Sequence, residues 1–125
     1  MSSSTEQAIR GNLHAHQELR TLSKGSKCVV AELEDDALIL LLGATKNRPR
    51  IPWTDLDDAV NWLRGRGWER VAYGRTTKPD PETLDGVLQR HTHRATSIYV
   101  AAIFVHAGLA QSEGGSPLRI RCALA

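Results

Sequence analysis

Cysteine is scarce in this chain, with only Cys28 and Cys122 among 125 residues. Two cysteines so far apart in the sequence are too few for the disulfide framework of a small secreted domain. Each lies in a run of residues typical of a strand, so a buried thiol is the expected role of both. Two neighbouring strands could nevertheless bring them together.

Long hydrophobic runs are also missing. The longest, Ala37 to Leu42, is far shorter than the roughly 20 apolar residues that span a membrane. The start, Met1 to Glu6, has neither the basic nor the apolar region of a signal peptide. The composition, 41% hydrophobic and 24% charged, is ordinary for a soluble globular protein of one domain. We therefore expect a cytoplasmic protein with no membrane partner.

The motifs of catalysis are lacking as well. No spaced carboxylate pair, nucleophile elbow or metal-nuclease motif accompanies the histidines. The segment Arg64-Gly65-Arg66-Gly67 lacks the lysine and the serine or threonine of a phosphate-binding loop. Asp55, Asp57 and Asp58 lie where a helix is predicted to begin, and the helix dipole explains them. The sequence predicts neither an enzyme nor a bound cofactor.

Two His-x-His pairs, His14/His16 and His91/His93, raise the question of a metal site. The first pair falls in a predicted helix, where residues two apart point in different directions. The second pair falls in a predicted turn and has no nearby acid to orient it. We therefore expect solvated or phosphate-facing histidines and no metal.

The N-terminal segment, residues 1–52, predicts a helix followed by a small antiparallel meander. Ser4 can cap a helix that runs to about Leu22, because Ile9, Leu13 and Leu19 recur at near-helical spacing. Strands are predicted at 27–34 and 37–42, with a turn at 35–36. A third strand at 50–52 is expected at an edge, because proline cannot donate to a ladder.

The segment 53–125 begins with a predicted helix capped by Thr54. Its buried stripe has i, i+3, i+4, i+7 spacing and consists of Leu56, Ala59, Val60 and Leu63. Two glycines, Gly65 and Gly67, are expected to end the helix. The tryptophans at its ends, Trp53 and Trp68, are expected to seal it against the core, with Trp62 at the margin of the stripe.

A strand, two helices and a hairpin are predicted to follow. The strand covers 68–73, and Asp80-Pro81-Glu82 has the residues of a helix start. A break at 91–94 has the length of a helix-turn-helix turn. The next helix, 95–107, is stopped by Gly108, and strands at 109–112 and 118–124 flank a glycine-rich turn.

This order of elements over residues 54–124 resembles the winged-helix family, one group of helix-turn-helix proteins. The resemblance implies that the helix 95–107 approaches the major groove of double-stranded DNA and that the hairpin loop is the wing. The expected fold is α+β: an N-terminal helix and meander, then a winged-helix-like unit. The implied DNA contacts are Arg90, His91, His93 and Arg94 at the turn, Thr96, Ser97 and Tyr99 at the helix start, and Arg119 and Arg121 in the last strand.

Charge is distributed unevenly along the chain. Residues 1–63 carry 7 basic and 9 acidic side chains, whereas residues 64–125 carry 9 basic and 5 acidic ones. The excess of positive charge therefore lies in the half with the helix-turn-helix pattern, which fits a polyanionic partner.

An alternative follows from the segment Ile98 to Val105, which is apolar nearly all round. Such a helix is usually buried on most of its faces, so only its first turn could read DNA. Its outer face would then pack against the meander or a second chain. The alternative function is therefore protein–protein interaction or homodimerisation, through this helix or through the meander edge.

Overall fold

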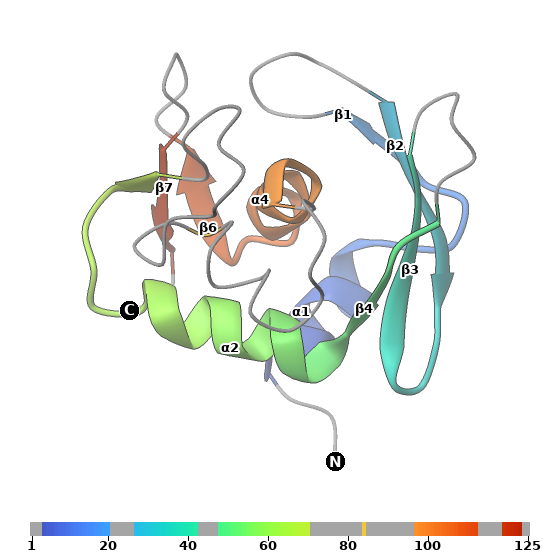
Figure 1. The fold of residues 1–125 in the computed structure, drawn as a ribbon, viewed down its shortest axis with the longest axis horizontal. Helices are drawn as coiled ribbons and strands as arrows, with labels where there is room; N and C mark the ends of the chain where they lie inside the picture. The colour runs from blue at the N-terminus through green and yellow to red at the C-terminus, as the bar shows by residue number, and fades with distance from the viewer. Residues whose placement is uncertain are drawn as a thin grey trace.

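The centre of the fold is α4 (Ser97–His106), which lies between two antiparallel sheets (Figure 1). The computed structural model describes residues 4–20, 27–42, 48–70, 84, 97–112 and 119–123. On one side of α4 is a four-stranded sheet from the N-terminal segment, and on the other a three-stranded sheet from the C-terminal segment. The protein is α+β, as the sequence predicts.

The four-stranded sheet has the order β1-β2-β3-β4. Its strands are β1 (Glu18–Arg20), β2 (Lys27–Leu33), β3 (Ala37–Leu42) and β4 (Arg50–Pro52), each antiparallel to its neighbour. The predicted meander is confirmed, and its proline-containing strand lies at an edge, where a missing N–H costs the ladder nothing.

The three-stranded sheet has the order β5-β7-β6. Its strands are β5 (Glu69–Arg70), β6 (Ala110–Ser112) and β7 (Arg119–Cys122). The predicted closing hairpin is confirmed, because β6 and β7 pair antiparallel. The middle strand carries Ile120, which is fully buried.

The helix α4 is buried along most of its length. Five consecutive residues, Val100 to Phe104, are each at most 4% exposed. The helix packs against α1 (Ser4–Asn12), β1 and β6. Its apolar outer face is therefore covered by the N-terminal segment of the same chain, one of the two arrangements that the sequence leaves open.

The helix α2 (Trp53–Leu63) buries the stripe predicted for it: each of its four members is at most 1% exposed. It packs against α1 and β7. One further buried side chain, Leu84, is helical. A single hydrophobic core thus draws on both the 1–52 and the 53–125 segments.

The first helix is shorter than predicted. It ends at Asn12, and the chain turns so that His16, with a φ of 70°, donates its backbone N–H to Val30. Leu19 then pairs with Cys28 in the sheet. The predicted extension of the helix is wrong for residues 13–20, because strand pairing overrides the apolar spacing that suggested a helix, and residues 21–22 lie outside the described part. Leu13 and Leu19 are nevertheless buried.

The predicted cap of α2 is also wrong. The helix begins at Trp53, directly after β4, and Thr54 lies inside its first turn. Pro52 is at the cap position and makes no side-chain capping bond. The backbone N–H of Trp53 instead donates to the carbonyl of Asp36 at 3.2 Å. The turn between β2 and β3 therefore satisfies the N–H that a side-chain cap would otherwise bind.

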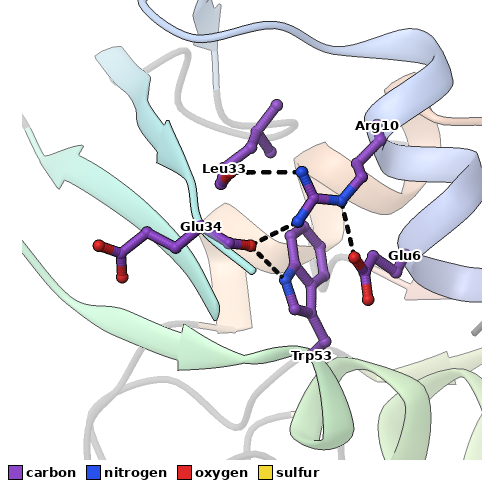
Figure 2. Close-up of polar contacts among 5 residues, drawn as sticks. All are labelled: Glu6, Arg10, Leu33, Glu34 and Trp53. Atoms are coloured by element: carbon purple, nitrogen blue, oxygen red, sulfur yellow. Dashed lines mark hydrogen bonds and ion pairs between the residues drawn. The ribbon is translucent and has the colours of Figure 1, made fainter. Parts of the chain in front are cut away.

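One arginine joins three parts of the N-terminal half (Figure 2). Arg10 on α1 donates to Glu6 at 2.7 Å, to the carbonyl of Leu33 at 3.3 Å and to the carbonyl of Glu34. Its guanidinium lies 5.0 Å from the ring centroid of Trp53, whose Nε1–H donates to the same Glu34 carbonyl at 2.9 Å. This cluster attaches α1 and the start of α2 to the end of β2.

Both cysteines are free thiols. Cys28 is fully buried on β2, and Cys122 is half-buried on β7 of the other sheet. The two strands that carry them are therefore not paired. Burial raises the pKa of the Cys28 thiol from 9.0 to about 11, because the thiolate would lose its hydration.

We expect Cys28 to be alkylated much more slowly than an unfolded thiol. At pH 8 the raised pKa lowers the thiolate fraction by roughly 100-fold, since only the thiolate reacts. Iodoacetamide labelling of a Cys122→Ala variant, followed by mass spectrometry with and without urea, measures this. Equal rates in the two conditions would contradict the buried position. The unfolded Cys28 thiol ionises at a lower pH than the folded one. Ionisation therefore favours the unfolded state, and the free energy of unfolding should fall as pH rises from about 9 to about 11.

Among the described residues, no helix has both the length and the apolar character needed to cross a membrane.

Candidate nucleic-acid interface

Most of the residues predicted at the helix-turn-helix lie outside the described ranges. These are Arg90, His91, His93, Arg94 and Thr96. Ser97 is the first residue of α4, but its side chain is outside the described part. Tyr99 is half-buried and packs against the core. Of the described candidates, only the two arginines of β7 are exposed.

Arg119 and Arg121 lie on one face of β7, on either side of the buried Ile120. Both are exposed, as their spacing of two residues in a strand predicts. In the ladder, Arg119 pairs with Arg70 of β5 and Arg121 pairs with Gln111 of β6. The outer face of the middle strand is therefore cationic.

Trp68 lies beside this face. The Arg121 guanidinium is 4.8 Å from the centroid of the Trp68 ring, and its Nε–H donates to Gln111 at 2.8 Å. Trp68 is 40% exposed and is one of two large hydrophobic side chains recorded as exposed in the described part of the chain, the other being Ile98. The prediction that Trp68 seals the end of α2 is wrong, whereas Trp53 is buried as predicted.

A second stack of the same kind lies at the end of α2. The Arg66 guanidinium is 4.6 Å from the ring centroid of Trp62, and Arg66 also pairs with Glu69 at 3.7 Å. Glu69 follows Trp68 directly, so the two stacks adjoin along the chain. The five side chains that form the two stacks and the β7 face are called the arginine–tryptophan surface: Trp62, Arg66, Trp68, Arg119 and Arg121.

Local structure explains why Arg66 and Trp68 are exposed to solvent. The segment from Arg64 to Gly67 leaves the helix through Gly65, whose φ of 76° suits glycine. The chain then enters β5, an edge strand beside β7. Trp68 lies just before this edge strand. Arg121 covers one face of its ring, so the ring is partly shielded from water without entering the core.

The sequence contained a signal for Trp68 that its hydrophobicity obscures. In the predicted strand 68–73, alternate residues share a face, so Trp68 lies on the same face as Arg70 and on the opposite face from Val71. The face that carries Arg70 is expected to be polar and exposed, so Trp68 is expected to be exposed with it. Arg66 offers no comparable signal, because its contact with Trp62 depends on how the chain leaves α2.

This surface combines fixed positive charge with flat aromatic rings. Guanidinium groups bind phosphate oxygens, and both guanidinium planes and indole rings stack on bases. Glu69 offsets part of the charge of Arg66, whereas Arg121 contacts only the neutral groups of Gln111 and Trp68 among the described residues. The terminal nitrogens of Arg121 are thus able to donate to an anion.

The histidine pair near the N-terminus lies in the turn after α1 and not in a helix. His14 and His16 are both exposed there, and Gln17 contacts His106 of α4 at 3.0 Å. Within the described ranges, no group of three or more histidine, cysteine or acidic residues is placed to hold a metal ion.

Comparisons with protein-family models, curated proteins and solved structures found no match to this chain.

Proposed function

We propose that this protein binds DNA without catalysis and that the arginine–tryptophan surface contacts the phosphates. The observation that carries the proposal is the outer face of β7, where Arg119 and Arg121 are exposed side by side. Two cations on one strand face, next to an exposed indole, form a surface that fits a polyanion carrying aromatic bases.

The distribution of charge along the sequence supports this position. The surface belongs to the half of the chain with the excess of basic residues. The candidates at the predicted turn, Arg90, His91, His93 and Arg94, belong to the same half and are proposed as further phosphate contacts. In the proposed winged-helix arrangement, β6 and β7 are the strands of the wing and the order α2, β5, α4, β6, β7 agrees with the predicted one. The predicted helix that begins at Asp80-Pro81-Glu82 lies, apart from Leu84, outside the described residues.

The proposed role of α4 differs from that of an exposed recognition helix. Burial of Val100 to Phe104 excludes the centre of α4 from contact with DNA, whereas its first turn carries the exposed Ile98 and the half-buried Tyr99. We therefore propose that the outer face of β7 makes most of the contacts with DNA. The first turn of α4 makes a contact at the margin of the bound DNA. The same burial removes the apolar face that a dimer through α4 would need. Among the described residues, the edges of the meander remain as the surface for the alternative function, homodimerisation or protein–protein interaction.

The test is removal of the two strand arginines together. Arg119→Ala combined with Arg121→Ala is expected to weaken binding of a 20-base-pair duplex by about 10-fold or more at low salt. Each lost phosphate contact should also reduce the slope of log K against log salt by about 0.9. Fluorescence anisotropy at several salt concentrations measures both quantities.

A matched control removes two exposed arginines from the other sheet, Arg20→Ala with Arg50→Ala, and so changes the net charge equally. It should leave the salt slope close to that of the unchanged protein. If both double variants weaken binding to the same extent, attraction depends on net charge and the assignment of this surface is wrong. Absence of any salt-dependent binding by the unchanged protein contradicts the function itself.

A further inference from the structure

The described structure has little with which to enter a groove of duplex DNA. Bases in a duplex are stacked inside it, and a protein reads their edges with an element inserted into a groove. The central residues of α4 are buried between the two sheets (Figure 1). What the described chain presents is the face of a three-stranded sheet, a shape that suits nucleotides whose bases are turned outward.

Trp68 supplies the aromatic platform that such nucleotides require. Trp68 is 40% exposed, although most large apolar residues of the described chain are buried. Arg121 lies against the ring at 4.8 Å, so indole and guanidinium form one stacked unit. A base of any sequence can stack on either component of that unit, since every base has a π-face.

The arginines complete the site. Arg119 and Arg121 are two residues apart on one strand, so their Cα atoms are about 6–7 Å apart. That separation lets the two side chains reach neighbouring phosphates of an extended strand. Gln111, already bonded to Arg121, adds an amide at the same face that can bond to a base edge.

Building on the proposed DNA binding, we infer that the ligand of the arginine–tryptophan surface is single-stranded DNA, with Trp68 as the residue on which a base stacks. The strand's phosphates pair with Arg119 and Arg121, and the base rests on Trp68 at the start of β5. No sequence preference follows, because stacking is tolerant of sequence.

The experiment compares three labelled probes by fluorescence anisotropy: a 20-nucleotide oligothymidylate, a 20-base-pair duplex and a 20-nucleotide oligouridylate. The unchanged protein is expected to bind oligothymidylate at least 10-fold more tightly than the duplex. Trp68→Ala should weaken binding of oligothymidylate by about 5- to 100-fold, and should weaken binding of the duplex by a smaller factor. Trp68→Phe should retain most of the affinity, because it keeps an aromatic face.

Trp62→Ala is the matched control, because it removes the other indole that lies under an arginine; it should lower the affinity for oligothymidylate less than Trp68→Ala does. Thermal unfolding of each variant establishes that the fold persists, and if Trp68→Ala fails to fold, the Trp68→Phe and Trp68→Leu pair carries the test. Duplex binding equal to or tighter than single-strand binding overturns the inference and leaves the proposed function standing. Tighter binding of oligouridylate overturns the assignment to DNA. If the unchanged protein shows no salt-dependent binding to any of the three probes, both the inference and the proposed function are wrong.

Discussion

Phe104→Ala is expected to lower the free energy of unfolding by about 3–5 kcal/mol, the range for removing a large buried aromatic side chain. Phe104 is fully buried in the C-terminal half of α4, in the core between the two sheets. The loss combines the transfer free energy of the removed ring with the cavity it leaves. Since domains of this kind are stable by only about 5–15 kcal/mol, much of the stability should disappear. Urea unfolding followed by tryptophan fluorescence measures it.

The control for this prediction is Ile98→Ala on the same helix. Ile98 is 39% exposed, so its replacement should change the stability by less than about 1 kcal/mol. The contrast distinguishes a core helix from a helix that reads DNA. If Phe104→Ala left stability unchanged and abolished DNA binding, α4 would be the contact surface and its burial in this fold would be incorrect.

Arg10→Met should destabilise the fold by about 1–3 kcal/mol, through lost hydrogen bonds and not through lost charge alone. The substitution keeps the aliphatic stem of the side chain but removes the donors to Glu6, Leu33 and Glu34 (Figure 2). The Glu6 side chain, only 10% exposed, loses its ion pair. Urea unfolding gives the change in stability.

Arg20→Met is the comparison for Arg10→Met. The Arg20 side chain is 62% exposed and meets Glu18 at 3.4 Å, so this surface pair should contribute no more than about 0.5 kcal/mol. A double-mutant cycle with Trp53→Leu, which removes the aromatic ring, then measures the coupling between Arg10 and the Trp53 side chain. Equal effects of the two arginine substitutions would show that the Arg10 cluster does not join α1 to the sheet.

The strands and the amphipathic helix were predictable from local pattern. Alternation placed β2, a short apolar run after a turn placed β3, and the stripe that includes Leu56 and Leu63 placed α2. The errors lie where a distant partner decides the conformation. The chain leaves α1 at Asn12 because β2 offers a strand partner, and α2 starts at Trp53 because the carbonyl of Asp36 binds its N–H. Neither partner is near in sequence, so spacing alone could not show them.

The candidate site was predictable only in part. The alternation of Arg119, Ile120 and Arg121 placed both arginines on one outer face. The apolar character of α4 indicated burial. The helix is covered by β6 and by α1 and β1 of the N-terminal segment, and the sequence offered cover by that segment only as one of two possibilities. Trp68 was expected in the core because of its size, although alternation along the predicted strand places it on the same face as Arg70. Propensity describes a residue's average environment, and a cation over an indole ring changes that environment.

The burial of α4 between two sheets determines where this chain can be truncated. A fragment beginning at residue 53 would lose α1 and β1, the elements that cover one side of α4. Buried side chains of α4 would then meet water, and the fragment would aggregate or remain unfolded instead of behaving as an autonomous DNA-binding unit. Any shortened form of the protein must therefore keep both halves.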